Sequence, residues 1–99
     1  MPKFILSKLA RDDLFEIWDY IAKTSIDQAD HIERELEAAF LKLSEIPGMG
    51  HVREELTDKN LKFWPVFDFL VVYTSDSQPL EIITIVHGAR ELKAFFAKF

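Results

Sequence analysis

Three histidines and the absence of cysteine limit the chemistry that this 99-residue chain can perform. His31 and Glu35 stand four residues apart, a spacing at which two side chains on one face of a helix can share a metal ion. They belong to a charge-rich stretch, so we interpret both as solvated side chains and expect no metal site. Without cysteine, no disulfide or thiolate zinc site can form, and a reducing cytoplasm is compatible with the chain.

Nucleophilic and acid–base catalysis find no support in the sequence. The histidines lie far apart, and no serine sits in a nucleophile-elbow pattern. The acidic pairs Asp12-Asp13 and Glu54-Glu55 fit a helix start and a polar loop, whereas a general acid or base needs a pocket and a shifted pKa. The stretch Gly48–Gly50 lacks the Lys-Ser/Thr ending and the preceding strand of a phosphate-binding loop, and indicates a turn. We therefore predict no catalytic residue and no cofactor.

Trp64 is the first of two features that point to contact with another protein. Pro65 follows it within a β-rich run and places that run at a sheet edge or a bulge, because proline has no N–H for a ladder hydrogen bond. A large aromatic side chain at a sheet edge serves either as part of the core or as an anchor for a partner. Both interpretations stay open at this point.

The second feature is a cationic C-terminal segment on an acidic chain. The chain carries 12 Lys and Arg against 17 Asp and Glu, a net charge of −5, yet only one acidic residue follows His87. An arginine near a helix start gains nothing from the helix dipole, so solubility alone does not explain Arg90. A salt bridge from Arg90 to Glu54 or Glu55 is the structural alternative. The basic residues of the segment are Arg90, Lys93 and Lys98.

A strand and a first helix are predicted at the start of the chain. The strand covers Lys3–Ser7 and leads into a helix over Lys8–Lys23, which has Ser7 as its N-cap. Asp12 and Asp13 are expected to stabilise this helix through their attraction to the positive end of its dipole.

A second helix is predicted to follow almost at once. Ser25 and Gln28 fit a capping box at its start. The stretch Ile46–Gly48 ends it, because proline cannot continue a helix and Gly48 is expected in the left-handed cap conformation. The short break between the helices predicts an antiparallel hairpin.

Three β-rich runs follow a long polar loop over residues 48–60. They cover Leu61–Phe67, Phe69–Ser75 and Glu81–His87, and a tight turn at Asp68 predicts a meander. A final helix is predicted from Ala89, with Leu92, Phe95, Phe96 and Phe99 on its apolar stripe. We therefore predict one α+β domain over residues 1–99: an N-terminal strand, an antiparallel helical hairpin packed on a mainly antiparallel four-stranded sheet, and a short C-terminal helix.

Composition excludes several classes of function. Hydrophobic residues make up 48% of the chain and aromatic residues 13%, which argues against disorder. We find no secretory signal pattern and no apolar run long enough for a membrane span, so we expect a cytoplasmic protein with no membrane partner. An acidic chain is a poor general binder of nucleic acid, because phosphate contacts need Lys and Arg, so we expect a protein partner.

Four stretches resemble the RelE/ParE superfamily of small bacterial toxins, and within it the ParE branch. They are LSKLARDDLFEIWDYIA (Leu6–Ala22), LSEIPGMGHVREEL (Leu43–Leu56), KFWPVFDFLVVY (Lys62–Tyr73) and LEIITIVHGAREL (Leu80–Leu92). Together they cover nearly the whole chain in the order of the family, and the last two are the more specific. The resemblance implies the toxin of a type II toxin–antitoxin module, neutralised by a cognate ParD-like antitoxin that wraps its C-terminal segment around the toxin.

The resemblance also separates two activities. RelE-like members cut mRNA in the ribosome with basic residues on the sheet, an arginine after the last strand and often a tyrosine or histidine near the C-terminus. The matching sheet positions here are the apolar Leu61, Phe63 and Leu70; only Arg90 matches, and Phe95 or Phe96 stands in place of the acid–base group. Phenylalanine neither takes a proton nor holds a phosphate, so we expect no enzyme. The ParE branch implies inhibition of DNA gyrase by protein contact.

The leading hypothesis is a gyrase-directed toxin in a hetero-oligomer with its antitoxin. The alternatives are a RelE-like ribosome-dependent mRNA endonuclease and an inactive toxin that only binds its antitoxin. The aromatic excess predicts exposed residues for the antitoxin on the hairpin and the sheet edge, namely Phe15, Trp18, Trp64 and Phe67. The cationic segment is predicted to contact the target through His87, Arg90, Lys93 and Lys98.

Overall fold

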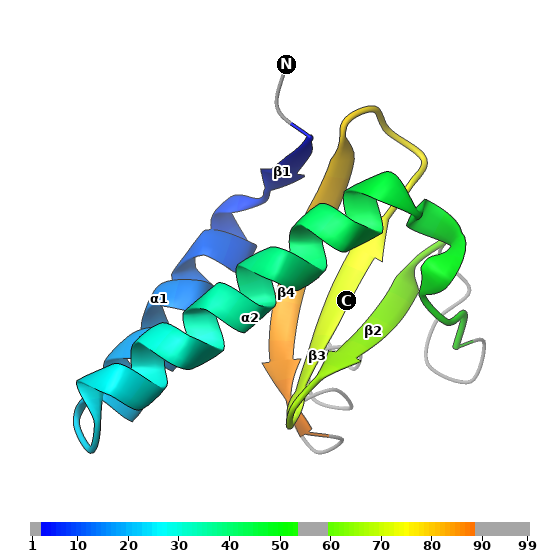
Figure 1. The fold of residues 1–99 in the computed structure, drawn as a ribbon. Coiled ribbons are helices and arrows are strands. Elements are labelled where there is room, and N and C mark those ends of the chain that lie inside the picture. Colours follow the sequence, from blue (N-terminus) through cyan, green and yellow to red (C-terminus); the bar gives the residue numbers. More distant parts are fainter. Residues whose placement is uncertain (1–2, 54–59, 89–99) are drawn as a thin grey trace.

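The elements follow the predicted order of strand, two helices and three strands. A computed structural model describes residues 3–53 and 60–88, and its elements are β1 (Phe4–Leu6), α1 (Lys8–Ala22), α2 (Ile26–Glu45), the 3-10 turn η1 (Pro47–Met49), β2 (Lys62–Val66), β3 (Phe69–Thr74) and β4 (Leu80–His87). Figure 1 shows both helices on one face of the sheet. The predicted α+β arrangement is confirmed, and the predicted helix from Ala89 lies outside the described residues.

Helices α1 and α2 begin where their serine caps predict. Ser7 Oγ accepts a hydrogen bond of 2.9 Å from the Ala10 amide, and Ser25 Oγ accepts one of 3.1 Å from the Gln28 amide. Each bond satisfies an amide that the first helical turn leaves without a partner. The two helices run antiparallel, as their short connection predicts (Figure 1).

The four strands form one mixed sheet in the order β1-β4-β3-β2. Strand β1 pairs with β4 in parallel, while β4, β3 and β2 form the predicted antiparallel meander. Strand β2 lies at one edge, as Pro65 predicts. Strand β1 pairs only with Leu80–Ile82, so the outer edge of β4 from Ile83 onward has no strand beside it among the described residues.

Apolar residues are buried on both faces of the sheet. The main core joins α1 and α2 to one face and includes Ala10, Leu36, Phe40, Leu43, Val71, Tyr73, Ile82 and Ile85. A smaller cluster contains Leu61, Phe63, Val72 and Val86. Because successive side chains along a strand point to opposite faces, Val72 lies on the face opposite Val71 and Tyr73. This two-sided burial agrees with the continuous apolar runs in β3 and β4.

Two local predictions about helix ends are wrong. Gly48 does not take the left-handed conformation, because α2 ends before Ile46, which has φ −129° and ψ 75°, and Pro47 starts η1. Asp12 and Asp13 lie beyond the first turn of α1, so they do not act on the positive helix end. Asp13 forms hydrogen bonds to β4 instead.

Candidate functional site

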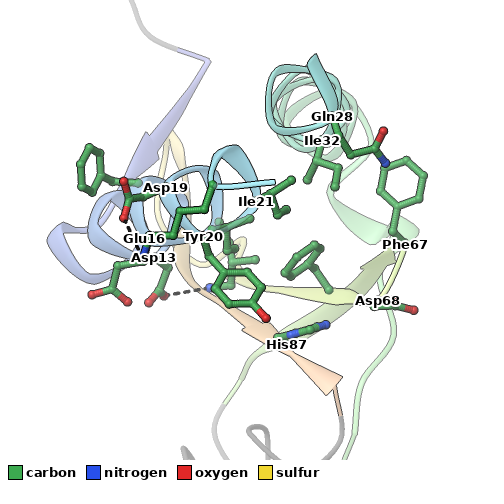
Figure 2. Close-up of a pocket in the computed structure, with 15 residues that line it drawn as sticks. Asp13, Glu16, Asp19, Tyr20, Ile21, Gln28, Ile32, Phe67, Asp68 and His87 are labelled. Atoms are coloured by element: carbon green, nitrogen blue, oxygen red, sulfur yellow. Dashed lines mark hydrogen bonds and ion pairs between the residues drawn. The ribbon is translucent and has the colours of Figure 1, made fainter. Parts of the chain in front are cut away.

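A groove runs between α1, the start of α2, the β2–β3 hairpin tip and the end of β4 (Figure 2). Its volume is about 880 Å³. The apolar part is lined by Ile17 and Ile21 of α1, Ile32 of α2, Phe69 of β3 and Ile85 of β4. A concave surface with an apolar lining and a few polar groups is the usual form of a binding site.

Three exposed aromatic side chains line the same groove. The exposed fractions are 67% for Phe15, 74% for Tyr20 and 59% for Phe67. Exposed aromatic residues gathered around a depression mark a surface for a partner. The sequence predicts Phe15 and Phe67 as partner contacts, whereas Tyr20 is not among the predicted residues.

Phe67 stands at the tip of the β2–β3 hairpin in an unusual backbone conformation. Val66 pairs with Phe69, which leaves Phe67 and Asp68 as the two turn residues. The φ of Phe67 is +54°, in the left-handed region that favours glycine at the first position of such a turn. Its ring lies against His31 of α2, with centroids 5.9 Å apart. The turn thus carries a large aromatic side chain where local geometry favours glycine.

Asp13 ties α1 to the outer edge of β4. Its carboxylate accepts hydrogen bonds from the Thr84 hydroxyl and, at 3.1 Å, from the Ile85 amide. Earlier in the chain, Ser7 donates its hydroxyl to the Ile83 carbonyl at 2.6 Å. These side chains satisfy β4 backbone groups that no described strand reaches. The Asp13 bonds hold α1 against β4, and so define the width of the groove between them.

The part of the groove formed by residues 3–53 and 60–88 is acidic. Its charged lining residues are Asp13, Glu16, Asp19, Asp68 and Lys23. Lys23 lies 3.9 Å from Asp19, but both side chains are exposed, so this pair contributes little to stability. Asp13 is engaged by β4. Glu16 and Asp68 are exposed on opposite sides of the groove in Figure 2, and both add negative charge that a partner meets.

Three apolar residues in or beside β2 and β3 are largely inaccessible. Leu61 and Phe63 are buried, and Leu70 is half-buried against them. Buried apolar side chains can neither hold a phosphate nor move a proton. Across residues 3–53 and 60–88, no three side chains of the metal-binding types come together, and neither helix is long and apolar enough to cross a bilayer.

Comparison with known proteins decides the family. A family model described as the ParE toxin of type II toxin-antitoxin system, parDE, matches residues 4–92. The chain belongs to the ParE toxin family. It is similar to Toxin ParE1 of Caulobacter vibrioides, with 39% identity over 57 residues, or 57% of this chain and 59% of that protein. The matched region therefore spans only 59% of the length of this relative.

A solved structure described as the chromosomal ParDE TA system from P. aeruginosa has the same fold. Its TM-score is 0.71 with 15% sequence identity, covering 86% of this chain and 94% of that chain. At this identity the likeness establishes the fold alone, and it agrees with the helical hairpin and mixed sheet described above.

In this ParE-family chain, Trp18 and Trp64 lie outside the groove. Trp18 Nε1 donates a hydrogen bond of 2.8 Å to Asp30 and so joins α1 to α2. Trp64 packs against the main core and stacks on the His51 ring, with centroids 6.1 Å apart. Both tryptophans are half-buried, so each combines a structural role with some exposed surface. Their contacts with an antitoxin stay predictions.

Of the residues predicted to contact the target, Arg90, Lys93 and Lys98 lie outside the described residues. His87 is exposed, lines the groove, and has its ring centroid 4.8 Å from that of Phe69. One predicted target residue thus shares a surface with two residues predicted for the antitoxin.

Tyr73 of β3 forms hydrogen bonds to the turn after α2 and so joins this turn to the sheet. Its hydroxyl donates to the Pro47 carbonyl at 2.7 Å and accepts from the Gly50 amide at 2.9 Å. Burial raises the pKa of Tyr73 above its ordinary value of 10.0, an effect partly offset by the Gly50 N–H. The hydroxyl therefore stays protonated and able to donate at neutral pH.

Proposed function

We propose that this ParE-family chain inhibits DNA gyrase by protein contact in the cytoplasm, and that a cognate ParD-like antitoxin neutralises it in a hetero-oligomer. The family match over residues 4–92 carries the proposal. The groove supports it, because exposed aromatic side chains around an apolar depression suit a protein partner better than a small polar substrate.

An inhibitor without an active site of its own fits the sheet better than an RNA-cleaving enzyme does. Cleavage of RNA needs a group that takes the 2′-hydroxyl proton and cations that hold the phosphate. Leu61 and Phe63 are buried where RNA-cleaving members carry basic residues. The endonuclease is the second candidate, because Arg90 matches the arginine that follows the last strand in those members.

Two reactions run side by side test the target. Purified chain is added to gyrase with relaxed plasmid and ATP, and separately to a reconstituted translation reaction. We expect loss of supercoiling with accumulation of cleaved DNA, and unchanged translation. Cleavage of mRNA in programmed ribosomes that Arg90→Ala abolishes would favour the endonuclease. Binding of the antitoxin without an effect in either reaction would identify an inactive toxin.

Trp64 is predicted to anchor the antitoxin. Trp64→Ala should weaken binding of the antitoxin encoded beside this gene by more than about threefold, because it removes a half-exposed indole at the sheet edge. Calorimetry measures the Kd, and thermal unfolding checks the fold. Trp64→Phe keeps most of the packing against the core and serves as the matched variant. A smaller change for Trp64→Ala rejects Trp64 as an anchor.

The cationic C-terminal segment is predicted to make the protein toxic. Arg90→Ala combined with Lys93→Ala should remove most of the growth inhibition while antitoxin binding persists, because a basic patch steers an acidic chain toward an acidic target. Lys8→Ala combined with Lys42→Ala removes the same charge from exposed helical positions and is the control. Growth after induction is the measurement. Full toxicity of the first double variant would reduce the segment to a structural role.

A further inference from the structure

We infer that the outer edge of β1 binds an extended, acidic segment of another protein as an added strand. This edge consists of the backbone of Phe4–Leu6 on the side that faces away from β4. It lies outside the groove, so the inference goes beyond the proposed function and does not depend on it. The hydrogen-bonding capacity of the edge, the apolar side chains beside it and the local charge support the inference.

The outer edge of β2 is closed to an added strand. The Phe63 amide donates to the His51 carbonyl and the Phe63 carbonyl accepts from the His51 amide, at 2.8 Å in both cases. Strand residues face alternate sides, so Pro65 takes the next position that faces outward, and it has no N–H to donate. Such devices keep a sheet edge from pairing with another chain.

The part of the β4 edge that extends past β1 is closed as well. The Ile83 carbonyl accepts a hydrogen bond from the Ser7 hydroxyl, and the Ile85 amide donates to Asp13. An added strand would have to displace both side chains before it could pair with β4. In the part of the chain that the structure describes, β1 is therefore the edge that is left open.

Strand β1 presents backbone groups on its outer side. The Ser7 amide donates to the Ile82 carbonyl at 3.0 Å, so Ser7 faces β4. Because the N–H and C=O groups of successive strand residues point to alternate sides, Ile5 also faces β4, whereas Phe4 and Leu6 face outward. No described strand lies on this side of β1 (Figure 1). The amides and carbonyls of Phe4 and Leu6 can thus pair with an added strand.

Exposed apolar side chains lie beside this edge. Ile5 is 44% exposed and points away from the helices, because its neighbours Phe4 and Leu6 pack against the main core. Leu9 is 45% exposed and lies one helical turn before Asp13, on the side of α1 that bonds to the edge of β4. An added strand would cover Ile5 on one face and approach Leu9 on the other. Val and Ile side chains are the complement of such a surface.

The charge around β1 selects an acidic segment. The chain has a net charge of −5, yet its residues from Lys3 to Arg11 carry only basic charges. Lys3 and Arg11 are both exposed. Glu81, which is in register with Ile5, belongs to β4 and so lies on the other side of β1 from the open edge. Basic side chains attract an acidic segment and oppose the pairing of this edge with the same edge of a second copy.

Four peptides test the inference on the full chain. The first is acetylated and amidated, and has a central Val-Ile-Val run with two Glu residues at each end; its twin has Lys in place of Glu. Two further versions of the acidic peptide carry N-methyl groups, either on both Val amides or on the Ile amide. When the Ile lies opposite Ile5 in antiparallel register, the Val amides face β1 and the Ile amide faces away.

The acidic peptide should bind at least about fivefold more tightly than its Lys twin at low salt, and added salt should narrow the difference. Methylation of both Val amides should weaken binding at least about tenfold, because it removes the donors that pair with β1. Methylation of the Ile amide should have little effect. In hydrogen exchange, the Phe4 and Leu6 amides should gain protection on binding, and the Ile5 and Ser7 amides should change less.

Matched variants assign the charge. Lys3→Gln with Arg11→Gln should weaken binding of the acidic peptide by about three- to tenfold. Arg34→Gln with Lys42→Gln removes the same charges from exposed positions on α2 and should change binding by less than about twofold. Thermal unfolding shows whether each variant is folded.

Equal binding of the two methylated peptides would overturn the inference, because it would show docking through side chains alone. Equal binding of the acidic peptide and its Lys twin, or equal loss in both double variants, would also overturn it. Protection of Phe4 and Leu6 that rises with the concentration of the chain alone would assign the edge to a second copy instead. None of these variants changes a groove residue, so gyrase inhibition and antitoxin binding are tested separately from this edge.

Discussion

Gly50→Ala should destabilise the protein by about 2–4 kcal/mol, the sum of overpacking and of weakened bonds to the Tyr73 hydroxyl. A Cβ at this position would lie 2.7 Å from Tyr73 Cε1 and 2.9 Å from Cζ. The Tyr73 ring is fully buried, so it cannot swing into solvent to make room. Its hydroxyl would lose its bonds to the Pro47 carbonyl and the Gly50 amide. Backbone strain adds nothing, because Gly50 has φ −73°, which alanine adopts readily.

Gly48→Ala is the matched control, since a Cβ there meets nothing within 4 Å. It should be neutral or stabilise the protein by up to about 1 kcal/mol, because alanine lowers the conformational entropy of the unfolded chain. Denaturant titration gives both free energies of unfolding. Tyr73→Phe removes the hydroxyl that crowds the new methyl group. Gly50→Ala should therefore lower the free energy of unfolding less in the Tyr73→Phe background than in the native chain. Equal stability of the two alanine variants would show that Tyr73 does not fasten this turn.

Most parts of the fold that follow from local rules are predicted correctly, with the Gly48 cap and the Asp12-Asp13 helix start as exceptions. Ser7 and Ser25 are caps because a hydroxyl that precedes an apolar helical stripe finds the first-turn amides within reach. Pro65 marks an edge strand because it lacks a donor. Such rules depend only on a few neighbouring residues, so they can be applied to the sequence without the structure.

Features that join distant parts of the chain were missed or misread. Asp13 was interpreted as a helix-start residue, yet its partners Thr84 and Ile85 lie 71 and 72 positions away. Gly50 was interpreted as a turn residue, and only the approach of Tyr73 explains why a glycine is needed there. A pattern along the chain carries no signal for such pairs until the fold brings them together.

The candidate site was predictable only in part for the same reason. Phe15 and Phe67 were predicted as exposed aromatic residues, and the fold places both on one groove. Nothing in the sequence indicated that Glu16 and Asp68 would flank it, because they belong to different elements. Trp18 is predicted from the aromatic excess of the chain, and its bond to Asp30 gives it a role between the helices as well.

Asp13→Ala should destabilise the protein by about 2–4 kcal/mol, with a fall in melting temperature of roughly 10–25 °C for a domain of this size. The change leaves two donors without their charged acceptor. The Thr84 side chain is only 2% exposed, and the Ile85 amide lies on the edge of β4 that no described strand pairs. Water can reach a half-buried carboxylate site in part, which places the expected cost below that of a fully buried pair.

Asp12→Ala is the control, because Asp12 carries the same charge on the same helix, is exposed, and should change stability by less than about 0.5 kcal/mol. Thr84→Val removes one of the two donors to Asp13. It should therefore lower the free energy of unfolding less in the Asp13→Ala background than in the native chain, and a double-mutant cycle measures the difference. Binding of the antitoxin supplies a second readout. If Asp13 sets the width of the groove, Asp13→Ala should weaken antitoxin binding even at a temperature where the variant stays folded. Native stability together with native antitoxin binding would mean that water satisfies this edge of β4, and that packing of Ile17 and Ile85 alone sets the width of the groove.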